Sequence, residues 1–204
     1  WETPIADLVP VLKKNANINV DISDPLGNIG AFRMNHLFPP FDNKMIRRAV
    51  LTAMNQEDYM RSIVGDDNKL WKNLPGFFTP DTPLYTEAGG EVLKQRNIEA
   101  AKKMIKDAGY KGEPVVCLIA QDQPNTKAWF GWPTSQPVED AIIEWFDAKD
   151  LAGEKVAMDK LNKSALEDVV YAPTGFFMGY QAWRKNVTGV VKGPLPFFWN
   201  VAKA

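Results

Sequence analysis

Apolar and polar positions recur along the chain with periods that change from strand-like to helix-like. Residues 17–22 alternate between polar and apolar side chains, which is the period of a half-buried strand. Residues 29–37 predict a second strand, and Pro39-Pro40 ends it because proline cannot donate to a strand ladder. After a short helix or turn over residues 5–14, the chain is therefore expected to form two strands.

The second of these strands has two faces of different chemistry. Phe32, Met34 and His36 share its apolar face, which indicates a packed histidine. Arg33 and Asn35 share the opposite face, close to the end of the strand. Polar groups in that position face either a ligand cleft or bulk solvent, and the residues alone leave both interpretations open.

Helical periods dominate the rest of the chain. Each of several segments with an apolar helical face is preceded by a side chain suited to cap a helix N-terminus. These caps are Asp42 or Asn43 for the first helix, and Asn55, Asn97 and Asp150 for later helices. Together, stripes and caps predict helices over residues 44–54, 56–64, 98–108, 137–146 and 151–166.

Two further strands and two long loops complete the pattern. Residues 114–120 form an almost continuous apolar run, which is typical of a strand buried on both faces, and residues 169–172 predict another strand. Residues 66–90 and 121–137 contain no clear element. Because long structureless loops are uncommon in compact domains, the second loop indicates that sequence is missing there.

Composition and charge narrow the classes of function. The 204 residues include 24 basic and 25 acidic side chains, a near balance that argues against a nucleic-acid partner. No apolar run approaches the roughly 20 residues that span a bilayer. A chain that opens with Trp1 is expected to have been cut from a longer one, so targeting signals are treated as lost.

Catalytic and metal-binding chemistry has little support in the residues. One cysteine, Cys117, and one histidine, His36, cannot form a four-ligand Cys/His zinc site. A Ser-His-Asp triad would have to use His36, and no G-x-S-x-G motif accompanies it. The adjacent carboxylates Glu167 and Asp168 point in different directions on a helix, so they do not form a catalytic pair.

Several sequence blocks, in order, resemble the family 5 solute-binding proteins, which are the dipeptide- and oligopeptide-binding subunits of ABC importers. The first block reads Phe38-Pro39-Pro40-Phe41-Asp42-Asn43 and continues through Arg47 to Val50. Similar blocks follow at residues 53–58, 97–110, 145–173 and 183–201. Any one block is weak evidence, but their shared order covers most of the chain.

The resemblance implies one lobe of a two-lobed α/β protein with a mixed sheet, of the periplasmic-binding-protein type. The ligand, a short peptide or a related small polar molecule, would be held between the lobes and passed to ABC permease subunits at the membrane. The implied location is periplasmic, with no cofactor, no metal and no enzymatic activity. Residues 1–16 would be a remnant of the preceding lobe, residues 17–174 the C-terminal lobe, and residues 175–204 a tail returning toward the other lobe.

The candidate ligand-binding residues are Arg33, Asn35, Trp71, Trp129 and Trp132. The tryptophans lie in loop-like segments, where an indole can stack on a ligand or pack against another lobe. The resemblance also implies that a stretch is missing near residues 121–128. The aspartate that binds a peptide's amino terminus in this family falls in that stretch, so no residue is assigned that role. Alternatives are an interaction lobe that docks on a transporter or sensor without ligand and, more remotely, an enzyme.

Overall fold

The computed structural model describes residues 6–94, 96–115, 133–195 and 197–203, and these form two compact units. The first unit comprises residues 1–31, 55–85 and 173–204, and the second comprises residues 32–54 and 86–172. Each unit is therefore assembled from segments that are far apart in the sequence. The division into segments 1–16, 17–174 and 175–204 remains a prediction.

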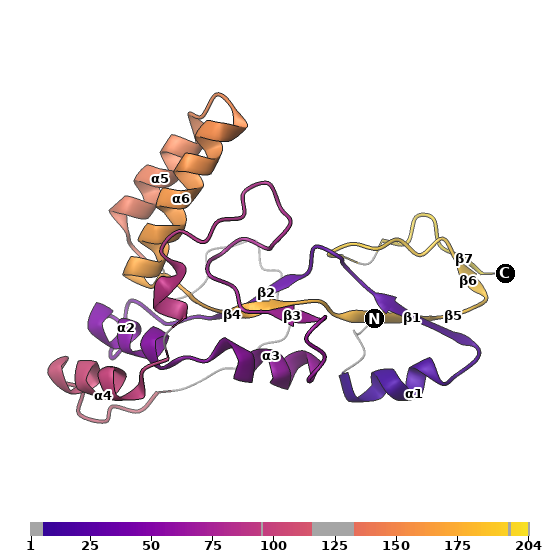
Figure 1. Ribbon diagram of the computed structural model, residues 1–204, viewed down its shortest axis with the longest axis horizontal. Coiled ribbons are helices and arrows are strands. Elements are labelled where there is room, and N and C mark those ends of the chain that lie inside the picture. The colour runs from indigo at the N-terminus through magenta and orange to yellow at the C-terminus, as the bar shows by residue number, and fades with distance from the viewer. Residues whose placement is uncertain (1–5, 95, 116–132, 196, 204) are drawn as a thin grey trace. The chain divides into compact units, whose positions relative to one another are not determined.

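The first unit contains the strands and two of the helices (Figure 1). Its elements are η1 (Ala6–Leu8), α1 (Val9–Lys13), β1 (Ile18–Ile22), β2 (Asn28–Phe32), α3 (Gln56–Val64), β3 (Trp71–Lys72), β4 (Ala172–Phe177), β5 (Tyr180–Arg184), β6 (Val187–Thr188) and β7 (Ala202–Lys203), of which Phe32 and Ala172 belong to the second unit.

Its strands form three small sheets. β4 lies between β2 and β3, and β3 pairs with it in antiparallel fashion, with Trp71 opposite Phe177. β1 pairs antiparallel with β5, from Ile18 opposite Arg184 to Ile22 opposite Tyr180, and β6 pairs antiparallel with β7. The mixture of helices with these sheets agrees with the expected α/β class.

One buried side chain ties three segments of the first unit together. Gln56, at the start of α3, is only 5% exposed. Its Nε2 donates to the carbonyl oxygens of Leu74 (2.8 Å) and Pro173 (2.7 Å), and its Oε1 accepts from the Leu74 amide (2.6 Å). α3, the strand β4 and the chain after β3 are thus held by a fully used amide group.

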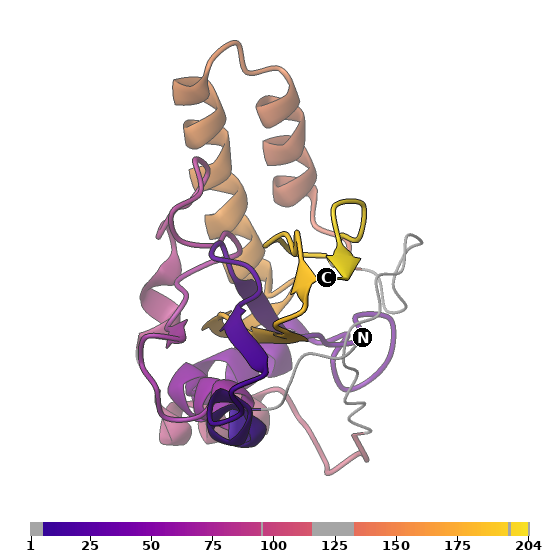
Figure 2. The ribbon, with the colours of Figure 1, turned by 90° about the vertical axis from the view of Figure 1, so that its right-hand side faces the viewer.

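The second unit is mainly helical. It contains α2 (Lys44–Ala53), η2 (Gly90–Leu93), α4 (Ile98–Asp107), α5 (Gln136–Phe146) and α6 (Leu151–Asp168). α2 packs against α4, and α5 lies beside α6 as a helical hairpin, which Figures 1 and 2 both show. Among the described residues, no helix combines the length and apolar character needed to span a membrane.

The core of the second unit packs α2 against the segment that follows β2 and against the segment that follows α6. Met34, Leu51, Met54, Val169 and Ala172 form one buried cluster, with each of these residues at most 7% exposed. Partly buried apolar side chains, including Phe32 and Phe41, pack around it. The segment that leads from β2 into α2 is therefore anchored at Met34 by hydrophobic burial.

The helices and caps predicted from the sequence are confirmed. Asn43, Asn55, Asn97 and Asp150 each accept a hydrogen bond from an amide in the first turn of their helix. Gly65 follows α3 with a φ of 81°, and its amide donates to the carbonyl of Arg61, as expected for a C-terminal glycine.

Three strand predictions need correction or lie outside the described residues. β2 ends at Phe32, so Arg33 and Asn35 do not lie on a strand face. Val169 takes a left-handed conformation (φ 52°) at the end of α6, which moves the start of the next strand from residue 169 to Ala172. The predicted loop 66–90 contains β3 and the start of η2. The strand predicted at 114–120 lies almost wholly outside the described residues.

The Gln56 contacts lead to a test by substitution. Gln56→Met keeps the side-chain volume but leaves the Leu74 amide and two carbonyls without partners, so we expect a loss of about 3 kcal/mol in the free energy of unfolding. Urea unfolding measures it. Gln136→Met, at an exposed position of α5, is the matched control and should change stability by less than about 0.5 kcal/mol. Equal effects of the two substitutions would contradict the assigned role of Gln56.

Candidate ligand-binding site

The segment between β2 and α2 carries two of the candidate ligand-binding residues. Met34, 1% exposed, fixes it in the core, and Asn35 on its C-terminal side is exposed. Asn35 Oδ1 accepts a hydrogen bond from the Leu37 amide (3.0 Å), which closes a local turn. This turn and the burial of Met34 explain why the strand stops at Phe32.

Arg33, on the other side of Met34, is half-buried against an aromatic ring. Its guanidinium carbon lies 5.9 Å from the ring centroid of Tyr171, within the range of a cation–π contact. Burial lowers the pKa of Arg33, and Tyr171 partly offsets this. Arginine remains protonated at neutral pH, so Arg33 presents a partly desolvated positive charge.

Arg47 holds this segment in place from α2. Its Nη1 donates to the carbonyl oxygens of Phe41 (2.9 Å) and Asp42 (3.1 Å), and its Nη2 donates to that of Asp168 (3.0 Å). Burial lowers the pKa of Arg47, while the charges of Asp168 and Asp42 act in the opposite direction. One side chain thus joins the turn before α2 to the end of α6.

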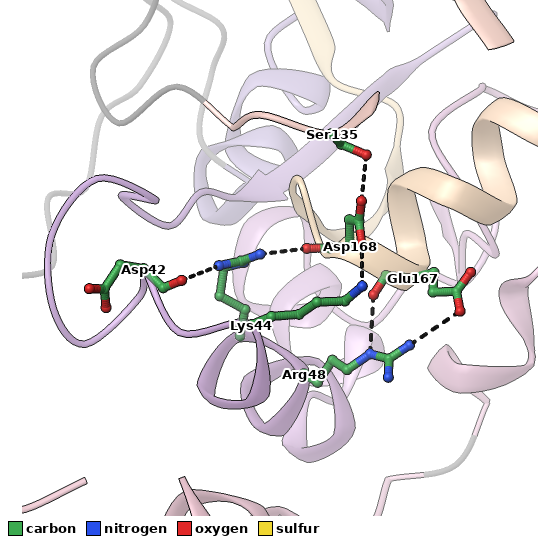
Figure 3. A network of polar contacts seen from close by, with 7 residues as sticks. Asp42, Lys44, Arg48, Ser135, Glu167 and Asp168 are labelled. Carbon is green, nitrogen blue, oxygen red and sulfur yellow. Dashed lines mark hydrogen bonds and ion pairs between the residues drawn. The ribbon is translucent and has the colours of Figure 1, made fainter. Parts of the chain in front are cut away.

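Asp168 extends this network beyond Arg47. Its carboxylate accepts hydrogen bonds from Lys44 and from the hydroxyl of Ser135, as Figure 3 shows. Burial alone would raise the pKa of Asp168, but these two hydrogen bonds and the charges of Lys44 and Arg47 outweigh it and leave the pKa below its ordinary value. Arg48 adds an exposed contact through its Nε to the Glu167 carbonyl (3.1 Å).

His36 is half-buried, and the charges of two arginines affect its pKa. Burial lowers its pKa, and the charges of Arg47 and Arg33 act in the same direction, against the backbone carbonyls of Val170 and Val169. The imidazole is therefore mainly neutral at pH 7. A neutral, half-buried ring agrees with the packed histidine expected from the sequence.

The network favours a structural role over a catalytic one. Ser135 donates its hydroxyl proton to Asp168, and a carboxylate with a lowered pKa is a weak general base. In the described part of the chain, no group of three or more His, Cys, Asp or Glu side chains could hold a metal ion. What the arrangement supplies is a rigid support for the segment bearing Arg33 and Asn35.

The candidate residues that the structure describes belong to different units. Arg33 and Asn35 lie in the second unit, two residues apart, whereas Trp71 lies in the first unit. Trp71 is in β3 rather than in a loop, half-buried, with an indole Nε1 that has no hydrogen-bond partner among the described residues. Trp129 and Trp132 lie outside the described residues.

Sequence reasoning missed the residues that support the segment. Arg47 falls off the apolar stripe of its helix and so looks exposed, yet it is only 7% exposed. Ser135 and Tyr171 carried no recognisable pattern. The one available signal for a role of Arg47 was its position inside the Phe38–Val50 block, the first of the blocks that resemble the family.

The sequence matches the model of a known protein family. The pattern of the bacterial extracellular solute-binding proteins, family 5 middle region, matches residues 1–144. The chain belongs to this family. The Arg47 network therefore lies in a family 5 chain, and its turn 38–43 falls within the matched region.

Individual relatives extend the match over nearly the whole chain. The probable peptide ABC transporter periplasmic-binding protein of Sinorhizobium fredii is 23% identical over 279 residues, which cover 98% of this chain and 51% of the relative. The chain thus spans about half the length of that protein. The alignment is longer than the 204 residues of the chain, so the relative has residues inside the matched region that this chain lacks.

Solved structures share the fold at low sequence identity. The oligopeptide-binding protein AppA of Bacillus subtilis, in complex with a nonapeptide, has a TM-score of 0.75 and 12% identity, covering 99% of this chain and 55% of AppA. The binding protein MoaA from A. tumefacien R10, in complex with mannopinic acid, has a TM-score of 0.73 and 13% identity, covering 94% and 52%. The chain therefore has the fold of about half of a periplasmic binding protein.

The environment of His36 leads to a pH-dependent prediction. Its pKa in the folded state lies below its ordinary value of 6.5, so the unfolded chain binds the proton more tightly. The contribution to stability is fully present above about pH 6.5 and is lost as the pH falls through the folded-state pKa. NMR titration of the single histidine measures this pKa directly. His36→Gln should flatten the change in unfolding free energy between pH 7 and 5, and a folded-state pKa at or above 6.5 would contradict the assigned burial.

Proposed function

We propose that the protein bearing this chain binds a short peptide, or a related small polar ligand, and delivers it to the permease subunits of an ABC importer. The observation that carries this proposal is the family 5 match over residues 1–144. The Sinorhizobium fredii relative is named as a peptide-transport binding protein, and AppA holds a nonapeptide. The same comparison supports a location outside the cytoplasmic membrane, in the periplasm.

The proposed ligand class is supported by what similar proteins hold. AppA binds a peptide and MoaA binds mannopinic acid, so this fold accepts ligands that differ in backbone but share a carboxyl group. Arg33 suits such a group, because a guanidinium forms two parallel hydrogen bonds with a carboxylate. Its partial burial against Tyr171 strengthens that attraction by excluding water.

Asn35 adds a neutral polar contact beside this charge. Its Oδ1 is engaged by the Leu37 amide, which leaves its exposed amide NH₂ group as the donor for a ligand oxygen. Trp71 in the first unit, and Trp129 and Trp132 outside the described residues, remain predicted stacking contacts for a ligand. These residue roles are part of the proposal.

Substitution of Arg33 tests the proposed ligand contact. We expect native mass spectrometry of the chain with a mixture of short peptides to show a bound species. Arg33→Ala should weaken binding of the selected peptide roughly 10- to 100-fold, since a hydrogen bond to a charged group contributes about 1.5–3 kcal/mol. Isothermal titration calorimetry then measures the change in Kd.

Arg61→Ala is the matched control, because Arg61 is an exposed arginine of α3 that pairs with Glu57 at 2.6 Å. Equal affinities of the two variants would rule out Arg33 as a ligand contact. If the unsubstituted chain binds neither peptide nor mannopinic acid, the chain is better described as an interaction lobe that docks without ligand. Turnover of a bound peptide would instead favour an enzyme.

A further inference from the structure

Arg33 and Tyr171 come from distant parts of the sequence and meet in the second unit. Arg33 directly follows β2, and Tyr171 directly precedes β4, which neighbours β2 in its sheet. The guanidinium carbon of Arg33 lies 5.9 Å from the centroid of the tyrosine ring. A guanidinium at this distance is attracted by the negative charge on the face of the ring. The fold therefore pairs this arginine with one particular aromatic side chain.

Both members of this pair are held by buried neighbours in the chain. Met34 follows Arg33, Ala172 follows Tyr171, and these two neighbours belong to one buried cluster. Val170, on the other side of Tyr171, is also buried, and its amide donates to a backbone carbonyl of α6 (3.0 Å). The backbone that carries each side chain is thus fixed by close packing. A ring fixed in this way can in turn restrict the guanidinium that lies against it.

We propose that Tyr171 is a positioning residue for the ligand: its ring holds the guanidinium of Arg33 so that the site prefers a free carboxylate to the corresponding amide. This inference rests on the proposed function, in which Arg33 contacts the ligand. Tyr171 acts through the arginine and needs no contact with the ligand itself. Its role is therefore to determine which chemical group the arginine selects.

The preference for a carboxylate follows from the geometry of its contact with a guanidinium. The two groups form two parallel hydrogen bonds, which requires a fixed orientation of the arginine side chain. An unrestrained arginine loses rotamer freedom when a ligand fixes it, and this loss weakens binding. A ring that already restricts the side chain removes part of that loss. An amide carries no charge and has one acceptor oxygen, so it gains little from the same orientation.

The surroundings of Arg33 strengthen its attraction for an anion. The side chain is half-buried, and a partly desolvated charge is screened less by water than a fully exposed one. Arginine remains protonated at neutral pH, so this charge persists. Arg47, the more deeply buried arginine, instead donates to three backbone carbonyls and supports the fold. Of these two arginines, Arg33 is therefore the one suited to select a ligand carboxylate.

NMR of the 204-residue chain with two small probes tests the proposal. N-acetylglycine carries a free carboxylate, and N-acetylglycinamide carries an uncharged amide in its place. The side-chain Nε–H signal of Arg33, identified by its loss in Arg33→Lys, reports binding at this side chain. We expect the carboxylate probe to shift this signal in a saturable way and the amide to bind about tenfold more weakly. Tyr171→Leu should reduce this preference about fivefold, and Tyr171→Phe, which keeps the ring, should retain it.

Tyr180→Leu is the matched control. Tyr180 lies in the first unit, and Lys13 Nζ lies 4.7 Å from the centroid of its ring, so the substitution removes a contact of the same kind. It should leave the preference of Arg33 for the carboxylate unchanged. Tyr171→Met serves as a second ring-free variant in case Tyr171→Leu does not fold.

Three results would overturn the proposal. They are equal binding of the two probes at Arg33, an undiminished preference in a folded ring-free variant, and a loss in Tyr171→Phe as large as the loss in the ring-free variant. Failure of the proposed function is distinguishable from these results. A chain that selects N-acetylglycine through Arg33 and Tyr171 but binds no peptide would retain this inference and refute the peptide proposal.

Discussion

The buried guanidinium of Arg47 is the interaction on which the second unit depends. It donates to the backbone carbonyls of Phe41, Asp42 and Asp168. A charged group is retained there because it is hydrogen-bonded on several sides and lies in the field of Asp42 and Asp168. Through it, the turn before α2 and the last residue of α6 become one rigid piece.

The candidate ligand contacts depend on this constraint. Arg33 and Asn35 belong to an irregular segment that has no strand partner, so Met34 on one side and the Arg47-bound turn on the other determine where it lies. Gln56 does the same in the first unit by joining α3, Leu74 and Pro173. In both units, one polar side chain joins segments that are distant in sequence, as interleaved units require.

Local signals explain what the sequence predicted well. Helix caps such as Asn43, Asn55 and Asp150 act within four residues, so the boundaries of α2, α3 and α6 follow from the sequence. The end of β2 and the left-handed Val169 depend on tertiary burial of Met34 and Val169, which periodicity does not show. The burial of Arg47 was missed for the same reason, since its partners lie on distant segments.

Hydrogen exchange of Arg47→Lys, compared with the unsubstituted chain, tests the central claim most directly. Lysine keeps the charge but cannot make the forked contacts of a guanidinium. The account expects faster exchange in residues 37–43 and 166–170 together, with amides of β1 and β5 in the first unit unchanged. Unchanged exchange in both segments, or an equal increase across both units, would contradict it.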